Sequence, residues 1–145
     1  PRRGPNGIED QTTEGLNTSP PDKYCLIALG HKSSGVMGND DDLMKEVKKS
    51  SDITGERAWE LPMWKEYSED IKSKIADIKN LGAPMQAGTI AGGVFLQEFV
   101  GDTPWVHMDI AGMAWGPTKP SYQPKVGATG YGVRLVYDLL ENRIK

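Results

Sequence analysis

One segment of the chain alternates strictly between two kinds of side chain: Trp105-Val-His-Met-Asp-Ile110. Successive side chains of a strand point to opposite faces, so Trp105, His107 and Asp109 share one face. The aliphatic residues between them share the other face. The alternation therefore predicts a strand over 105–110.

A second run is apolar without alternation: Cys25-Leu-Ile-Ala-Leu29, which ends at Gly30. Such a run predicts a short strand that is buried on both faces. Around these two segments, capping residues and apolar side chains spaced three or four residues apart predict helices. The expected helices run from the N-cap Asn39 to about Lys49, from Pro62 to about Ile78, over 87–100, and from about Thr129 onward.

Each expected helix has its own apolar pattern. The first is expected to bury Leu43 and Val47, and the third is apolar nearly all round, which predicts burial. Small residues on one side of the third helix allow another backbone to come close. The stripes and small residues are Trp64, Tyr67, Ile71, Ile75 and Ile78 in the second helix, Ala87, Gly88, Ala91 and Gly92 in the third, and Val133, Val136, Tyr137 and Leu140 in the last.

Helices and strands alternate along the chain, which is typical of the α/β class. Two strands make a poor sheet for so many helices. We therefore expect a partial α/β/α layered domain, a mixed sheet with flanking helices that forms part of a larger unit.

The composition excludes several classes of protein. Of 145 residues, 37% are hydrophobic, and 17 Lys and Arg stand against 20 Asp and Glu. This balance argues against a nucleic-acid binder, which needs a basic surface. No apolar run is long enough for a membrane span, and the first residues do not resemble a signal peptide. One cysteine excludes a disulfide framework and a thiolate zinc site. We expect a soluble, cytoplasmic chain.

The first residues differ from the rest. Residues 1–23 contain only Ile8 and Leu16 as large aliphatic residues, with four prolines and many small polar residues. Such a stretch buries too little apolar surface to offset the entropy lost on ordering. We expect residues 1–24 to form a disordered or extended leader and residues 25–145 to form the folded part.

Candidate catalytic groups are few. His31 lies in a polar turn and is expected to be solvated, and His107 is expected to be a hydrogen-bonded structural residue. A triad of Ser33 or Cys25 with His107 and Asp109 is conceivable, but no G-x-S-x-G turn is present. We therefore do not expect a triad.

Two further groups of residues were considered as ligand-binding sites. The run 40–42 of three aspartates has no recognised calcium-loop spacing, so it predicts a helix N-terminus. Gly127, Gly130 and Gly132 resemble a phosphate loop only loosely, although a helix beginning near Thr129 could favour an anion.

Several segments together resemble the leucyl (cytosol) aminopeptidase family, specifically the carboxyl-terminal part of its catalytic domain. They occur in the family's order and at about its spacing, over roughly residues 25–143. The matching segments are Ala28-Leu-Gly30 with Gly35-Val-Met-Gly-Asn39, Thr54-Gly-Glu-Arg57, Trp59, Leu61-Pro62-Met-Trp64, Tyr67, Lys72-Ser-Lys-Ile-Ala-Asp77, Asn80, Ala87-Gly-Thr-Ile-Ala91, Phe95-Leu96, Trp105-Val-His-Met-Asp-Ile-Ala-Gly112, Trp115 and Gly127-Ala-Thr-Gly-Tyr-Gly-Val-Arg134.

The resemblance implies a two-metal exopeptidase that removes amino-terminal residues, especially leucine, with zinc or manganese. It also implies a peptide substrate and a hexameric assembly. In the family, aspartates, a glutamate and a lysine hold the two metal ions, and an arginine and a second lysine assist. These residues lie in two segments that precede the match to Cys25–Leu29.

Neither of those segments is found in these 145 residues. The nearest echo, Thr13-Glu-Gly-Leu16, lacks the arginine and the aspartate, and we interpret it as a coincidence. The family's Thr-Leu-Thr-Gly stretch, which helps hold the substrate, is replaced by Pro21-Asp-Lys-Tyr24. By the resemblance, Ala111 and Ala114 line the pocket for the first substrate side chain. No metal ligand or catalytic residue is expected in this chain.

Three hypotheses follow. The first is a carboxyl-terminal fragment of a leucyl aminopeptidase, lacking the amino-terminal half of the catalytic domain and inactive alone. The second is a non-catalytic module that oligomerises or joins full-length subunits. The third is an active enzyme with replacement ligands such as Asp10 and Glu14. The first predicts exposed sheet edges and apolar helix faces, and a chain that is marginally stable or self-associating.

Overall fold

A three-stranded sheet forms the centre of the structure, a computed structural model that describes residues 23–84, 86–115 and 127–144. Its strands are β1 (Ser34–Gly38), β2 (Ala58–Glu60) and β3 (Val106–Asp109), in the order β2-β1-β3. β1 pairs in parallel with β2 and antiparallel with β3, with Val36 opposite Met108. The sheet is therefore mixed, as the sequence predicts.

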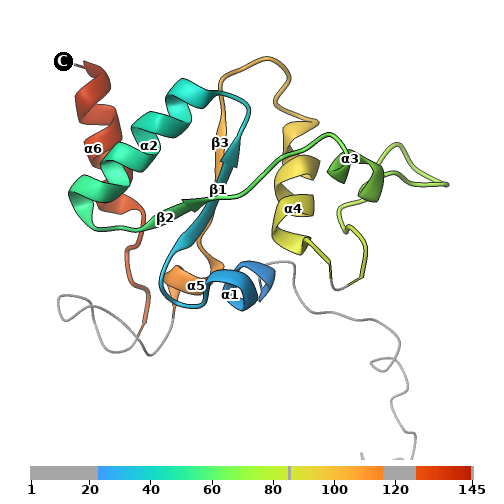
Figure 1. Cartoon of the computed structure of the whole chain (residues 1–145), viewed down its shortest axis with the longest axis horizontal. Helices are drawn as coiled ribbons and strands as arrows, with labels where there is room; N and C mark the ends of the chain where they lie inside the picture. The colour runs from blue at the N-terminus through green and yellow to red at the C-terminus, as the bar shows by residue number, and fades with distance from the viewer. Residues whose placement is uncertain (1–22, 85, 116–126, 145) are drawn as a thin grey trace, which may run out of the picture.

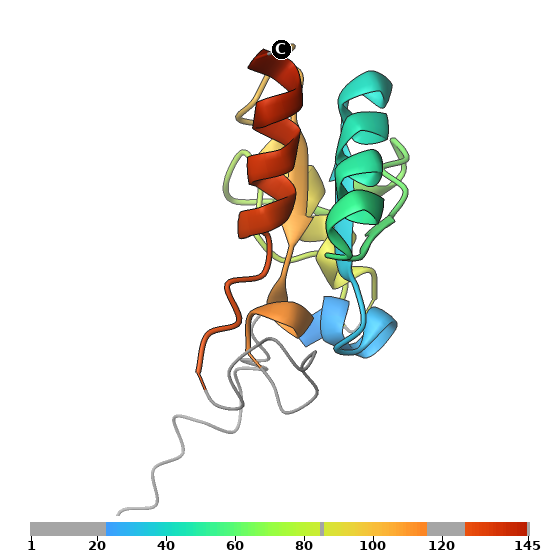
Figure 2. The same ribbon diagram turned by 90° about the vertical axis from the view of Figure 1, so that its left-hand side faces the viewer.

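Helices cover both faces of this sheet (Figure 1). Two of them, α2 (Asp41–Thr54) and α6 (Val133–Ile144), lie side by side on one face in both views (Figures 1 and 2). On the other face α4 (Gly88–Gln97) packs against β1, and the single turn α3 (Tyr67–Asp70) packs against α4. Two short helices, α1 (Lys23–Leu29) and α5 (Ala111–Ala114), contact each other at one end of the sheet. The predicted α/β/α layering is confirmed.

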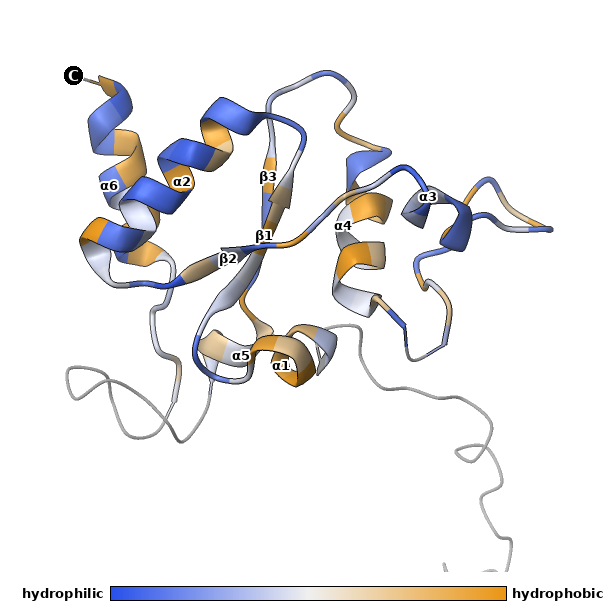
Figure 3. Ribbon diagram, viewed as in Figure 1, coloured by the Kyte–Doolittle hydropathy of each residue, from blue (hydrophilic) through white to orange (hydrophobic). Residues whose placement is uncertain are grey.

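The buried apolar residues form two clusters. Between the sheet and the α2–α6 pair, Val36, Met44, Val47 and Leu135 are buried. In the second cluster, Ala91 and Val94 of α4 pack against Ile71, which follows α3. The apolar stripe on α2 and the largely apolar α4 are visible in Figure 3.

The strand predicted at Cys25–Leu29 is wrong, because these residues form α1. Cys25 is buried and Leu26 and Leu29 are half-buried, whereas Ile27 and Ala28 are exposed, which is a helical pattern. Leucine and alanine are strong helix formers, and a short apolar run does not distinguish a helix from a strand. Gly30 ends the helix with a positive φ of 61°.

The buried strand follows instead at Ser34–Gly38, which has little strand propensity. Its glycines are required by packing. A side chain at Gly38 would overlap the main-chain oxygen of Trp105, and one at Gly35 would press on Leu61. Because these two glycines have no side chain, the neighbouring segments can lie close to this strand.

The helix predicted over 62–78 is also largely wrong. Only α3 is helical there, and Ile75 is almost fully exposed at 99%. The hydroxyl of Ser73 accepts hydrogen bonds from the N–H groups of Ile75 and Ala76, at 3.3 and 3.2 Å. Such a local turn competes with helix formation. Of the residues in the predicted apolar stripe, Ile71 is buried.

Helix α2 begins one residue later than predicted and ends later. Asp40 is the N-cap, since its Oδ1 accepts a hydrogen bond from the N–H of Leu43 at 2.7 Å. Asn39 lies between β1 and α2, and its side-chain oxygen accepts a hydrogen bond from the N–H of Trp105, just before β3, at 2.8 Å. Val47 is buried as predicted, and Leu43 is half-buried against the core.

Helix α6 turns the predicted apolar stripe away from the core. Leu135 and Leu139 pack toward α2, while Val133, Tyr137 and Leu140 are 68%, 67% and 53% exposed. The expectation of an exposed apolar helix face is thus confirmed for α6. Residues 1–22 of the predicted leader lie outside the described residues.

Candidate functional site

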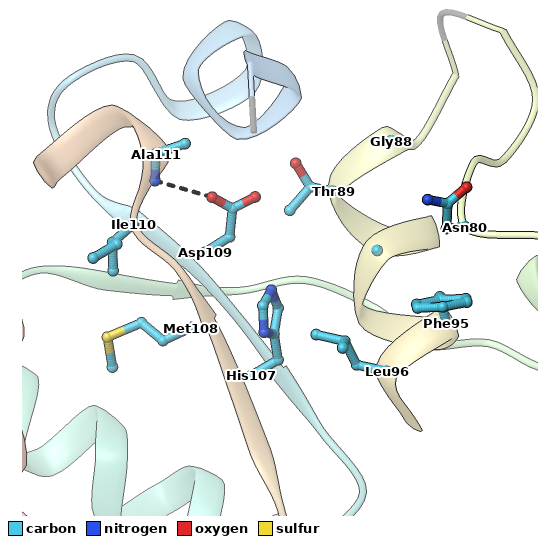
Figure 4. A pocket seen from close by; sticks show the side chains of 11 residues that line it. Asn80, Gly88, Thr89, Phe95, Leu96, His107, Met108, Asp109, Ile110 and Ala111 are labelled. Atoms are coloured by element: carbon cyan, nitrogen blue, oxygen red, sulfur yellow. Dashed lines mark hydrogen bonds between the residues drawn. The ribbon is translucent and has the colours of Figure 1, made fainter. Parts of the chain in front are cut away.

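A pocket of about 490 Å³ opens between α4 and the end of β3 (Figure 4). Its wall is mainly apolar, and a few polar side chains converge on it, as is usual for a small-ligand site. The lining residues are Asn80, Gly88, Thr89, Gly92, Phe95, Leu96, His107, Met108, Asp109, Ile110 and Ala111.

Asp109 stands at the polar end of this pocket, where β3 passes into α5. One oxygen of its carboxylate accepts a hydrogen bond from the N–H of Ala111, at 3.0 Å. Thr89 lies across from it on α4 (Figure 4). The Thr89 hydroxyl is buried, and no other polar atom of the described residues bonds to it.

His107 stacks on Trp105, with 6.0 Å between the ring centroids. The predicted common face of these two residues is therefore confirmed. Burial lowers the pKa of His107, and the nearby Asp109 carboxylate opposes this shift only in part. His107 is thus mainly neutral at pH 7, and its ring forms part of the pocket wall.

Cys25 and Ser33 do not form a triad with His107. The Cys25 thiol is buried and bonds to the main-chain oxygen of Asp109, at 3.6 Å. Burial, with a smaller contribution from the Asp109 charge, raises its pKa to about 11. A neutral, enclosed thiol is a poor nucleophile. Ser33 donates instead to the main-chain oxygen of Arg57, at 3.0 Å.

Two other polar sites singled out in the sequence have partners within the chain. Asp40 caps α2, and Asp42 pairs with Lys45 at 2.8 Å, so this run forms a helix N-terminus as predicted. His31, expected to be solvated, is half-buried and its Nδ1 lies 2.6 Å from the main-chain oxygen of Gly112. That expectation is wrong, because α5 folds back against the turn after α1.

The anion favoured by the start of the last helix is supplied by the chain itself. The buried Glu56 accepts hydrogen bonds from the N–H groups of Gly132 and Leu135, at 3.1 and 2.9 Å. Arg134 lies 3.4 Å from the same carboxylate. No signal in the sequence marks Glu56 as this partner, since 76 residues separate it from Gly132.

Metal ligands are not clustered in the part of the chain that the structure describes. Among these residues, no group of three or more His, Cys, Asp or Glu side chains is placed to hold a metal ion. The side chains at the pocket therefore do not fit a two-metal centre, which needs several carboxylates around each ion. Within the same residues, no helix is both long and apolar enough to cross a membrane.

Comparison with known proteins places the chain in a family. The model of the cytosol aminopeptidase family, catalytic domain, matches residues 22–137. The chain belongs to the cytosol aminopeptidase family. It is 54% identical to a probable cytosol aminopeptidase of Geobacter sp. strain M21 over 82% of this chain. It is 54% identical to the probable cytosol aminopeptidase of Geobacter sulfurreducens over 83% of this chain. It is 47% identical to the probable cytosol aminopeptidase of Cenarchaeum symbiosum over 82% of this chain.

The chain spans only about a quarter of the length of these cytosol aminopeptidases: 24%, 24% and 25% respectively. The carboxyl-terminal resemblance inferred from the sequence thus corresponds to a short part of the family's chain. Of the two residues that the resemblance assigns to a substrate pocket, Ala111 lines the pocket between α4 and β3, whereas Ala114, one turn further along α5, is not one of its lining residues. Sequence reasoning missed Thr89, whose only signal is the single hydroxyl of a mostly apolar helix.

Proposed function

We propose that this chain forms the substrate-pocket wall of a leucyl aminopeptidase catalytic domain and does not hydrolyse peptides by itself. The observation that carries the proposal is the position of Ala111. It lies in the family-matched segment and lines an apolar pocket at the end of β3. Phe95, Leu96 and Ile110 supply a wall suited to an aliphatic side chain such as leucine.

In this proposal the substrate is the amino-terminal end of a peptide. Ala111, and Ala114 beyond it, leave room for the first side chain because each carries only a methyl group. The zinc or manganese ions of the intact family are held by residues outside this chain, so no catalytic step is assigned to its side chains. The cytosol is the proposed location, following the names of the relatives.

The second candidate is a non-catalytic module that joins full-length aminopeptidase subunits or its own copies. The apolar face of α6 favours it, since Val133, Val136, Tyr137 and Leu140 are exposed together. An exposed apolar face of this kind marks a protein interface or the boundary with a missing part of the domain. Light scattering that finds only monomers, with no full-length partner retained, would exclude this candidate.

A chimera tests the pocket. Residues 25–143 replace the corresponding part of the Geobacter sulfurreducens relative, and leucyl and alanyl p-nitroanilide hydrolysis is measured. We expect an active chimera in which Ala111→Phe lowers kcat/KM for the leucyl substrate about tenfold or more, because filling the pocket excludes a large side chain. The alanyl substrate should lose less.

Ala76→Phe is the matched control, because Ala76 lies on an exposed turn and is not one of the residues that line the pocket. It should leave both substrates within about twofold of the unmodified chimera. Equal losses for leucyl and alanyl substrates in the Ala111 variant would contradict a role of this pocket in reading the first side chain.

A further inference from the structure

The short helix α5 places Ala111 in the pocket wall, but its own hydrogen bonds do not fix its position. It has only four residues, and the backbone is already extended at Trp115, with φ −149° and ψ 138°. The last carbonyl oxygens of a helix have no donor within the helix, which here applies to Gly112, Met113 and Ala114. Donors from elsewhere in the chain are therefore needed to hold α5.

Two residues distant in sequence supply these donors. The hydroxyl of Thr129 donates to the main-chain oxygen of Met113 at 2.7 Å, and the Thr129 N–H donates to that of Ala114 at 3.0 Å. The third donor is His31, whose Nδ1 lies 2.6 Å from the main-chain oxygen of Gly112. Because a carbonyl oxygen only accepts hydrogen bonds, Nδ1 carries the hydrogen in this contact.

The contact of His31 lies where α5 packs most closely on the turn after α1. Gly112 is buried, and a Cβ there would overlap the main-chain oxygen of Gly30. His31 follows Gly30 directly, and α1 and α5 lie side by side at one end of the sheet (Figures 1 and 2). A shift of α5 away from this turn would also move Ala111, the residue before Gly112.

The position of Ala111 affects how well the pocket fits a large side chain. Phe95 and Leu96 belong to α4, whereas Ala111 begins α5, so the wall consists of two helices that are held separately. A large aliphatic side chain depends on contact with both parts of the wall. A methyl group depends on it much less, because an apolar pocket gains little free energy from so small a group.

We infer that His31 is a positioning residue for the first side chain of the substrate. Its Nδ1–H holds Gly112, and thereby holds Ala111 at the distance from α4 that suits a leucyl side chain. His31 does not line the pocket, so it acts through α5. This inference rests on the proposed function, because it takes the pocket at Ala111 as the place where that side chain binds.

Nuclear magnetic resonance of the 145-residue chain tests the hydrogen bond itself. The two tautomers of a neutral histidine are distinguished by a long-range proton–nitrogen spectrum, recorded at a pH high enough to leave the ring neutral. We expect the hydrogen of His31 on Nδ1. A hydrogen on Nε2 would overturn the inference, because Nδ1 would then have nothing to donate to Gly112.

Substitution of His31 in the chimera tests the positioning role. His31→Leu removes the donor, and we expect the ratio of kcat/KM for leucyl over alanyl p-nitroanilide to fall about threefold to tenfold. His31→Asn should keep this ratio within about twofold, because its side-chain amide can donate from near the place of Nδ1. Lys32→Leu is the matched control, because Lys32 is the exposed neighbour, and it should stay within about twofold as well.

A merely structural role of His31 would give a different result. If His31 only stabilised the fold, His31→Leu would lower the rates for the leucyl and alanyl substrates equally, in proportion to the protein lost by unfolding. Equal losses for the two substrates would therefore overturn the inference. A fall of the ratio in His31→Asn as large as that in His31→Leu would overturn it too, because the donor would then not matter.

Ala111→Phe in the same chimera distinguishes failure of this inference from failure of the proposed function. If Ala111→Phe lowers the leucyl-to-alanyl ratio and His31→Leu does not, the pocket reads the first side chain without help from His31, and only the inference fails. If neither variant changes the ratio, the first side chain binds elsewhere, and both proposals fail. An unmodified chimera without activity would also count against both.

Discussion

Replacement of Glu56 by alanine is expected to lower the free energy of unfolding by about 2–4 kcal/mol. The carboxylate is only 3% exposed and accepts hydrogen bonds from the first turn of α6, through Gly132 and Leu135. Its removal leaves these N–H groups buried without an acceptor and takes the negative charge from the positive end of the helix. The variant should also weaken the packing of Leu135, which is fully buried against α2.

Two further substitutions make the Glu56 test specific. Glu56→Gln keeps an acceptor oxygen but loses the charge, so we expect a smaller loss of about 1–2 kcal/mol. Glu98→Gln is the control, because Glu98 is exposed at the end of α4, and it should change stability by less than about 0.5 kcal/mol. Urea unfolding followed by circular dichroism measures all three. Similar stabilities for the alanine variant and the control would contradict this account of α6.

Gly93→Ala and Gly92→Ala are expected to change stability in opposite directions. A Cβ at Gly93 would overlap the Sδ of Met37, and Met37 is fully buried in β1, so it has no room to move away. A Cβ at Gly92 meets nothing within 4 Å. Overpacking costs about 1–3 kcal/mol, whereas alanine in place of glycine in a helix contributes about 0.5–1 kcal/mol.

The pair of glycine variants is its own control, because both residues lie in α4 and both changes add one methyl group. We expect Gly93→Ala to unfold at a lower urea concentration than the original chain and Gly92→Ala at a higher one. Equal shifts for the two variants would contradict the close packing of α4 on β1.

The sequence predicted those elements whose periodicity agrees with their packing. The alternation at 105–110 gave β3. Of the small residues noted in the third predicted helix, Gly88 lies close to the ring of Tyr24, whereas the close approach to Met37 is at Gly93, which was not among them. The α/β class and the family resemblance were confirmed on the same segments.

The errors arise where tertiary contacts outweigh local pattern. β1 is a glycine-containing segment selected by close packing rather than by strand propensity, and α1 carries the apolar run that resembles a strand. On α6 two apolar stripes compete, and only the buried one, with Leu135, contacts the core. A single sequence does not reveal which stripe meets a neighbouring element.

The candidate site was predictable only in part. Ala111 followed from the family-matched segment, but the pocket depends on where α4 packs relative to β3, and Thr89 becomes notable only when its burial is known. A helix near Thr129 was noted only as able to favour an anion; α6 begins at Val133, and its first turn is bonded by the chain's own Glu56, a residue distant in sequence. Long-range pairing of this kind leaves no periodic trace in the chain.

The most direct test of the central claim is hydrolysis of leucyl p-nitroanilide by the purified 145-residue chain. The assay is run with manganese or zinc added and repeated with a chelator, and the full-length Geobacter sulfurreducens relative serves as the positive control. We expect no turnover above the protein-free rate in either condition, because we propose that the chain supplies only a pocket wall, and its described residues contain no cluster that could hold a metal ion. Chelator-sensitive turnover by the chain alone would contradict this account, and it would show that its residues build a metal centre of their own.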